Sequence, residues 1–218
     1  MDAKQAVSPW KDTKDREHDR REKREAVLRV AAQAFCENGV RTTSLDEIAE
    51  RLNVTKPTLY HYFRSKDEIL AECVRIGLEL IDKAIADATG DGRTARDRLE
   101  AALHRYAEIM TMDFGMCITR IGEAELPPQS RKAFRAHKRK IDERIRSLIE
   151  EGVADGSISA RDVRLTAFTV SGALNWIARW YDPDGPLKPH EIARSCVDIL
   201  FEGLAPRVSK KPAECTRT

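Results

Sequence analysis

Residues 44–66 of this chain read SLDEIAERLNVTKPTLYHYFRSK, and the fold class follows from this stretch. Ser44 and Glu47 form a capping-box pattern, because the Ser44 hydroxyl can accept the Glu47 N–H and the Glu47 side chain can return to the Ser44 N–H. Apolar residues then recur on one helical face, at Leu45, Ile48, Ala49 and Leu52. The pattern predicts a two-turn helix over residues 45–52.

A second, shorter helix is predicted over residues 56–62. Asn53 suits the left-handed position that ends the preceding helix. Thr55 can cap the second helix, and Pro57 fits its first turn, where the missing N–H would have had no partner. The Ser-Lys-Asp-Glu run at 65–68 repeats the capping-box pattern, so a third helix should begin there.

The rest of the chain is helix-periodic, and we find no alternation of apolar and polar residues that would indicate strands. We therefore predict an all-α fold of about nine helices, a three-helix helix-turn-helix head joined to a larger helical body. The expected helices cover 20–38, 45–52, 56–62, 66–88, 94–112, 117–124, 129–154, 160–181 and 189–204. Before them, residues 1–19 should form a disordered or loosely ordered arm, and residues 207–218 a flexible tail.

Composition excludes several classes of protein. The net charge is only +2, although residues 1–66 hold 14 Lys and Arg against 11 Asp and Glu. The five cysteines are far apart and form no metal-binding pattern with histidine, so we expect no metal and no cofactor. No nucleophile elbow, phosphate-binding loop or dinucleotide fingerprint is present, so we expect no catalytic residues and no enzyme. Without an apolar run long enough for a bilayer, we expect no membrane contact and a cytoplasmic location.

The outward face of the 56–62 helix indicates what the head binds. Leu59 and Phe63 should face inward, which leaves Lys56, Thr58, Tyr60 and His61 outward. An exposed helix of this width fits the major groove, with hydroxyl and amine groups beside it on phosphates. The interpretation is sequence-specific binding to double-stranded DNA, with nucleoid association while DNA is bound. Two alternatives remain open: a helical enzyme or carrier with a well-capped hairpin, and an effector-independent DNA-binding protein.

Residues 27–71 resemble the DNA-binding domain of the TetR family of bacterial one-component repressors. The resemblance is carried by Val27-Leu28, Ala31, Phe35, Gly39, Thr43-Ser44, Ile48-Ala49, the run VTKPTLYHYF at 54–63 and the run KDEIL at 66–70. It implies a homodimer that binds a palindromic operator through residues 20–66. It also implies that residues 67–206 form an effector-binding and dimerisation domain, in which a small molecule moves the helix after residue 65.

The resemblance also assigns DNA contacts residue by residue. Bases or the groove wall would meet Lys56, Pro57, Thr58 and Tyr60. Phosphates would meet His61, Tyr62 and Lys66, and Thr43 would lie near the DNA backbone. Asn53 stands where the family usually has glycine.

Residues 172–186, GALNWIARWYDPDGP, look like those of family members that respond to acyl-CoA or related carboxylic metabolites. Candidate effector-binding residues are Met110, Phe114, Ile121, Phe168, Asn175 and Arg179. Candidate dimer contacts on the last two helices are Leu174, Ile177, Ile192, Cys196, Ile199 and Leu200. The alternative for the apolar residues of these two helices is that they face the core of the monomer. The alternative for Asn175 and Arg179 is that they form an ordinary interface pair and bind no effector.

One helix carries a run of basic residues whose role stays open. The run comprises Arg131, Lys132, Arg135, His137, Lys138, Arg139, Lys140, Arg144 and Arg146. It can be a solvated face, or part of it can hold the phosphates of a CoA-type effector, since clustered Arg and Lys pair well with phosphate.

Overall fold

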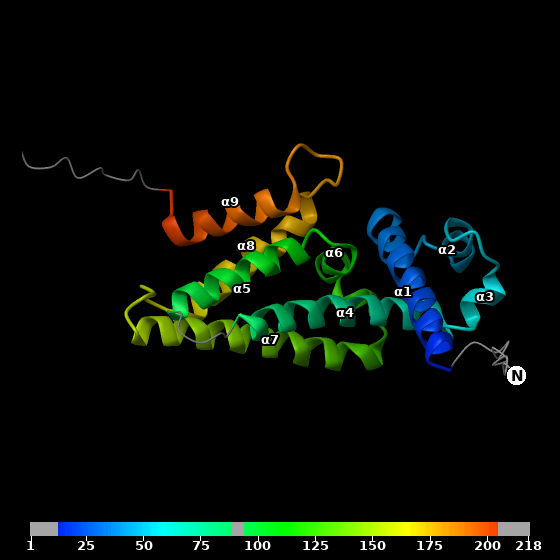
Figure 1. Cartoon of the computed structure of the whole chain (residues 1–218), viewed down its shortest axis with the longest axis horizontal. Helices are drawn as coiled ribbons and strands as arrows, with labels where there is room; N and C mark the ends of the chain where they lie inside the picture. Colours follow the sequence, from blue (N-terminus) through cyan, green and yellow to red (C-terminus); the bar gives the residue numbers. More distant parts are fainter. Residues whose placement is uncertain (1–12, 89–93, 205–218) are drawn as a thin grey trace, which may run out of the picture.

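A computed structural model describes residues 13–88 and 94–204 (Figure 1). All regular elements in these two segments are helices, which confirms the predicted all-α class. In chain order they are α1 Thr13–Asn38, α2 Leu45–Arg51, α3 Lys56–Tyr60, α4 Lys66–Asp87, α5 Ala95–Ile109, α6 Asp113–Arg120, the single 3₁₀ turn η1 Glu123–Glu125, α7 Pro128–Ala154, α8 Val163–Trp180 and α9 Pro189–Glu202.

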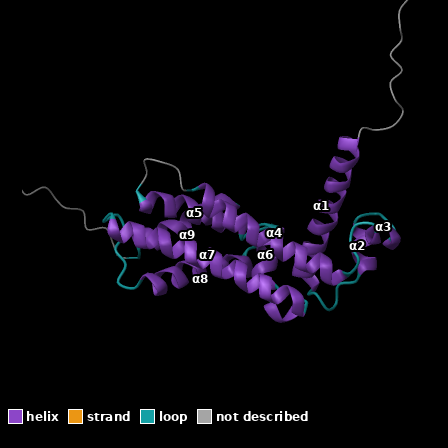
Figure 2. Cartoon of the chain, turned by 90° about the horizontal axis from the view of Figure 1, so that it is seen from below, coloured by secondary structure: helices purple, strands orange, loops and turns teal. Residues whose placement is uncertain are grey.

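The helices divide the molecule into a head and a body. Helices α1, α2 and α3 gather at one end, and α5, α7, α8 and α9 form the other (Figures 1 and 2). Helix α4 runs from the head into the body, and α6 packs against α1, α4 and α8. One continuous apolar core joins both parts, from Leu28 and Phe35 in the head to Leu103 and Ile145 in the body. None of the described helices has the length and apolar character that crossing a bilayer requires.

Helix α1 is longer than predicted. It begins at Thr13, so residues 13–19 are helical and do not belong to a loose arm. The prediction was wrong there because this segment is charged all round and offers no apolar stripe that would mark a helix. The remainder of the predicted arm, residues 1–12, and the predicted tail, residues 207–218, lie outside the described residues.

Both predicted capping boxes are half formed. The hydroxyls of Ser44 and Ser65 accept the N–H groups of Glu47 at 3.1 Å and Glu68 at 3.2 Å. The return bond to the N–H of the capping serine is replaced in both. The Glu47 carboxylate accepts from the side chains of Asn38 and Arg51, and the Glu68 carboxylate accepts the N–H of Arg64 at 2.7 Å. The helix starts were nevertheless correctly predicted, since one bond to the N-cap hydroxyl is enough to mark each start.

Two backbone positions behave as predicted in the left-handed region. Asn53 has φ of 54° between α2 and α3, and Gly39 has φ of 84° directly after α1. Asparagine tolerates this conformation better than most residues, because its short polar side chain can bond locally. These two residues set the turns on either side of α2.

Helix α6 was predicted over 117–124 and lies instead at Asp113–Arg120, followed by η1. The error came from reading Phe114-Gly115 as a break. Gly115 is inside the helix, where a Cβ would lie 1.8 Å from the carbonyl oxygen of Ile109. Glycine at 115 therefore lets the end of α5 lie against α6. Gly77 of α4 allows a similar close approach to α6, since its Cβ would lie 2.3 Å from the carbonyl oxygen of Phe114.

Helix α8 begins at Val163, three residues later than predicted, and Asp162 is its cap. The Asp162 carboxylate accepts the N–H of Leu165 at 2.9 Å. Ser157, in the segment between α7 and α8, caps the start of α5, where its hydroxyl accepts the N–H of Arg96 at 3.2 Å. Because Ser157 is far from α5 in the sequence, this contact forms only in the folded chain.

Candidate DNA-binding and effector sites

Helix α3 presents the outward face that the sequence predicted. Leu59 and Phe63 are buried against the head, with exposed fractions of 1% and 2%. Tyr60 is 50% exposed, and Pro57 and His61 are exposed beside it. Buried anchors on one side of a single-turn helix therefore hold the opposite side toward solvent.

The other polar side chains on and just after α3 are only half-exposed, and some are paired within the head. Thr58 is half-buried, and its hydroxyl lies 2.9 Å from that of Thr55, which makes no hydrogen bond to a helix N–H. Tyr62 is half-buried just after the helix. Lys56 pairs with Asp46 of α2 at 2.8 Å between Nζ and Oδ2, and this hydrogen bond raises the pKa of Lys56. The lysine is fully charged, but a carboxylate already neutralises it.

Two residues predicted to lie at the DNA backbone face inward. The Thr43 side chain is 1% exposed, and its hydroxyl donates to the carbonyl oxygens of Ala34 and Gly39. Lys66 donates from Nζ to the carbonyl oxygens of Val40 at 2.7 Å and Thr43 at 2.9 Å. The turn after α1 leaves carbonyl groups without helical partners, and these two side chains satisfy them.

Two exposed cations of the head were not among the predicted contacts. Arg41 is in the turn between α1 and α2, and Arg64 lies between α3 and α4. The Arg41 side chain is 88% exposed and lies 3.6 Å from a carboxylate oxygen of Glu125. Their charge was visible in the sequence, but only the fold puts them at the same end of the molecule as α3 (Figure 1).

The body contains a cavity of about 430 Å³ between α4, α5, α6, α7 and α8, which we call the central cavity. Its lining is Leu78, Ile81, Tyr106, Ile118, Lys138, Arg139, Ile141, Asp142, Arg146, Phe168, Ser171, Gly172 and Asn175. Apolar residues of α4 and α6 form one side, and charged residues of α7 form another. A cavity of this size suits a small molecule or the acyl portion of a larger one.

A buried polar pair crosses the central cavity's wall. The hydroxyl of Tyr106 donates to Oδ1 of Asn175 at 3.0 Å, and burial raises the pKa of Tyr106 to about 12. Arg146 pairs with Asp142, yet its buried Nε has no hydrogen-bond partner. The cavity thus has the fixed side-chain amide of Asn175 and the guanidinium of Arg146 in its lining, whereas the Arg146 Nε is enclosed by protein.

The six predicted effector residues do not share one site. Phe168 and Asn175 line the central cavity, whereas Phe114 lines a separate hollow between α1 and α6. Met110 and Ile121 are buried and line none of the cavities described, so they are core residues. Arg179 is exposed, one turn beyond Asn175 on α8, and it lines none of the cavities described.

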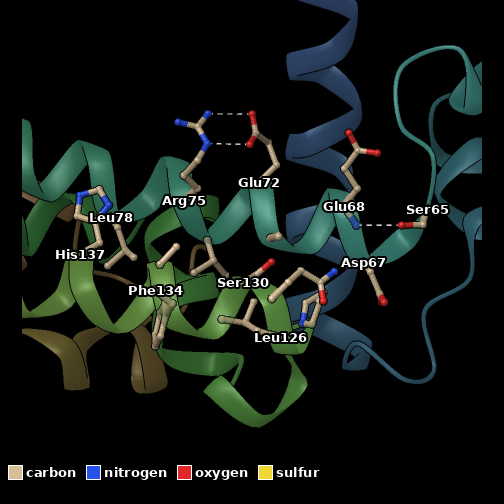
Figure 3. Close-up of a pocket in the computed structure, with 15 residues that line it drawn as sticks. Ser65, Asp67, Glu68, Glu72, Arg75, Leu78, Leu126, Ser130, Phe134 and His137 are labelled. Carbon is tan, nitrogen blue, oxygen red and sulfur yellow. Dashed lines mark hydrogen bonds and ion pairs between the residues drawn. The ribbon is translucent and has the colours of Figure 1, made fainter.

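A second cavity, of about 480 Å³, lies between the first half of α4 and the start of α7 (Figure 3). It extends from Ser65 to His137, and Figure 3 shows Glu72 and Arg75 paired along α4. We call it the α4–α7 cavity. Its wall includes Phe134 and Leu126, and the buried Nε2 of His137 has no hydrogen-bond partner.

Comparisons with known proteins identify the family of this chain. Residues 27–73 match the family described as bacterial regulatory proteins, tetR family, and residues 92–204 match the tetracyclin repressor-like C-terminal domain. The chain belongs to the TetR family. It is therefore a DNA-binding transcriptional regulator and not an enzyme, as the sequence predicted.

Relatives within the TetR family cover almost the whole fold. The HTH-type transcriptional repressor KstR2 of Rhodococcus jostii is 29% identical over 187 residues, which cover 84% of this chain and 91% of that protein. The crystal structure of the TetR-family regulator PfmR from Thermus thermophilus has a TM-score of 0.71 at 32% identity, covering 83% of this chain and 99% of PfmR. AibR, solved with isovaleryl coenzyme A and operator DNA, has a TM-score of 0.71 at 28% identity, and the match covers 82% of this chain and 97% of AibR.

The predicted dimer contacts of this TetR-family chain split between its core and its surface. Leu174, Ile177 and Ile192 are buried inside the monomer, so for them the alternative interpretation holds. Cys196 and Leu200 are half-buried, and Ile199 is 51% exposed. The exposed apolar side chains of α8 and α9 are Leu165, Phe168, Trp176, Trp180 and Ile199. Helical periodicity identified two apolar stripes but could not tell which of them faces inward.

Most of the basic run on α7 is engaged within the protein. Arg131 donates to the carbonyl oxygens of Leu126 and Ala124, and Lys140 and Arg144 pair with Asp82. Arg135 pairs with Glu123, and Lys138 lies over the Phe134 ring. The basic residues at the central cavity are Lys138, Arg139 and Arg146.

One group of potential metal ligands occurs in the described residues, although the sequence predicted none. The ligand atoms of Glu100, His104 and Asp198, from α5 and α9, all lie within 4.8 Å of one another. The three side chains are partly or fully exposed, and exposed carboxylates often meet without an ion. We assign them no role in the site.

Proposed function

We propose that this chain is a repressor that binds a palindromic operator as a homodimer and is released by a small-molecule effector. Residues 20–66 would bind DNA, and residues 67–206 would bind the effector and form the dimer. The single observation that carries the proposal is the face of α3, where Pro57, Tyr60 and His61 are exposed above the buried anchors Leu59 and Phe63. Such a face suits the major groove.

We place the dimer contact on the exposed apolar side chains of α8 and α9. Trp176 is 64% exposed and Leu165 is 63% exposed, and α8, which holds both, is in the body and not in the head (Figure 1). Large aromatic side chains contribute much of the binding energy at protein interfaces. Pairing two copies through this face leaves both α3 helices free, as a palindromic site requires.

The effector we propose is a carboxylic metabolite carried as an acyl-CoA thioester. The apolar side of the central cavity suits an acyl group, and the Asn175 amide offers a donor for its carbonyl oxygen. Lys138 and Arg139 carry positive charge at the same cavity for phosphate groups. That AibR was solved with isovaleryl coenzyme A supports the ligand class for this chain.

The test uses the intergenic duplex upstream of the chain's own gene, labelled for fluorescence anisotropy, with a scrambled duplex as control. We expect tight binding to the first duplex and affinity that falls steeply with salt. A panel of acyl-CoA thioesters should then release the protein, whereas free CoA should not. Equal affinity for both duplexes would contradict sequence-specific repression, and release by no thioester would contradict the effector class alone.

A further inference from the structure

Two cysteines meet where the head joins the body. Cys36 is near the end of α1 and Cys117 is in α6, and their Sγ atoms lie 3.6 Å apart although 81 positions separate them in the chain. The same two helices are joined one turn earlier, where the amide of Gln33 donates to the carboxylate of Asp113 at 3.2 Å. The two sulfurs are thus held in contact by the packing of two helices.

The two thiols differ in accessibility. Cys36 is half-buried, so the residue is partly open to solvent, whereas Cys117 is completely buried. Cys73 of α4 is buried too, and its thiol donates to the carbonyl oxygen of Leu28 at 3.4 Å. Within the described residues, the remaining cysteine, Cys196, is on α9 in the body.

Charge and hydrogen bonding make Cys36 the more acidic thiol of the pair. A hydrogen bond from Cys117 and the positive charge of Arg120 lower the pKa of Cys36. The hydrogen bond to Cys36 and burial raise the pKa of Cys117, and burial raises that of Cys73. A thiolate at an accessible position is the form of cysteine that reacts with oxidants.

We infer that Cys36 and Cys117 are an oxidation site, at which a peroxide produces an intramolecular disulfide between the DNA-binding head and the body. The inference rests on two sulfurs in contact, one accessible and one buried, on the two helices that join head and body. No glutathione or partner protein is needed, because the second thiol is already beside the first.

The reaction balances with hydrogen peroxide as the oxidant. The Cys36 thiolate attacks one peroxide oxygen, the O–O bond breaks, and hydroxide leaves and is protonated to water. The sulfur of Cys117 then attacks the resulting sulfenic acid, the S–O bond breaks, and the Cys117 proton leaves with the hydroxyl as a second water. Two thiols and one peroxide give one disulfide and two waters, and the peroxide accepts the two electrons.

A cross-link at this position would fix α1 against α6. Helix α6 also contacts α4 and α8, and Arg120 near its end donates to the carbonyl oxygens of Ala178 and Tyr181. The disulfide therefore ties the head to the wall of the central cavity. Its regulatory meaning rests on the proposed function, since a repressor whose head must move when an effector binds would lose that movement on oxidation.

The test treats the reduced full-length protein with hydrogen peroxide, blocks remaining thiols with N-ethylmaleimide, and measures the mass under non-reducing conditions. We expect the monomer to lose two hydrogens and to take up two fewer labels. Trypsin should release residues 30–41 joined to residues 106–120, each of which contains one cysteine. Closing a loop of this length should also raise the melting temperature by roughly 5 °C or more.

Variants identify the roles of the two sulfurs. Cys117→Ser should accumulate a Cys36 sulfenic acid that dimedone traps, and Cys36→Ser should give no linked peptide, while the matched control Cys196→Ser should cross-link as the parent does. Cys117→Ala repeats the sulfenic acid test if a serine at this buried position destabilises the fold. A bridge through Cys73, Cys196 or Cys215, a bridge between two chains, or oxidation of Cys36 without any bridge would overturn the inference.

The inference and the proposed function fail separately. The linked peptide is measured without DNA or effector, so its absence says nothing about operator binding. The reduced protein's affinity for its upstream duplex, measured alongside, tests repression without reference to the cysteines.

Discussion

Lys56, on the face proposed to bind DNA, is already paired in the free protein. Its Nζ lies 2.8 Å from the Asp46 carboxylate, and both side chains are substantially exposed. In the proposed complex, DNA would compete with that carboxylate for Lys56, and Asp46 would add a negative charge near the duplex. We therefore expect the pair to moderate affinity, as a rim charge commonly does at an interface.

Replacing Asp46 by Asn should strengthen DNA binding by roughly threefold to tenfold at moderate salt, because it frees Lys56 and removes a like charge. Lys56→Ala should weaken binding. Anisotropy titrations of the two variants measure both effects. Glu50→Gln, which removes another exposed acid from α2, is the control for net charge, and an equal gain in that variant would show that the Lys56 pair has no special part.

Lys66 has a structural role that its sequence position did not predict. It bonds two carbonyl oxygens of the turn between α1 and α2 and so fixes α4 to the head. A lysine at a helix start was expected at a phosphate, but the carbonyl groups left unpaired by the helix end are nearer.

Lys66→Met keeps the aliphatic part of the side chain and loses both hydrogen bonds. We expect the free energy of unfolding to fall by about 1–3 kcal/mol, since two buried acceptors lose a charged donor. Urea unfolding followed by circular dichroism measures this loss. The slope of log affinity against log salt should be unchanged, and a slope lower by about one would mean that Lys66 contacts a phosphate after all.

At the scale of elements, Arg24 joins three helical segments of the head. Its guanidinium lies 2.9 Å from the Glu72 carboxylate of α4 and 4.7 Å from the centre of the Phe63 ring, just after α3. Hydrogen bonds from Arg75 and Arg24 lower the pKa of Glu72 to about 2. The start of α4 is thus tied electrostatically to α1.

This pair makes the head sensitive to acid. A carboxylate with a lowered pKa stabilises the fold above its unfolded value of 4.5, and that contribution disappears as pH falls toward about 2. Glu72→Gln should therefore cost about 1–2 kcal/mol at neutral pH and progressively less between these two values. Guanidinium unfolding at several pH values tests this. Glu79→Gln, at a more exposed partner of Arg75, should cost under about 0.5 kcal/mol, and a constant cost for Glu72→Gln across the range would contradict the argument.

At the scale of the whole molecule, the head and body share one core, and the exposed apolar residues concentrate on α8 and α9. A monomer rarely leaves two tryptophans exposed in this way without a partner for them. The residues that we first expected at the dimer contact, Leu174, Ile177 and Ile192, hold α8 and α9 to the body instead.

Trp176→Glu should shift the protein from dimer to monomer, because it places a charge in the centre of the proposed contact. Light scattering coupled to size exclusion measures the mass. Operator affinity should fall by more than tenfold, since one head reads only half of the palindrome. Val54→Glu, at an exposed apolar position of the head, should leave the mass unchanged, and a dimeric Trp176→Glu protein would place the contact elsewhere.

The sequence by itself determined the helix starts and turns of the head, because Ser44, Ser65, Asn53 and Pro57 act through bonds and dihedral angles within a few residues. It also determined the family and the face of α3, since the whole motif is local. Only the tertiary structure decided which apolar stripe of α8 is buried, that Gly115 lies inside α6, that Thr43 and Lys66 face inward, and that Cys36 meets Cys117. Each of these depends on what a distant segment places against the residue, and helical periodicity contains no information about that neighbour.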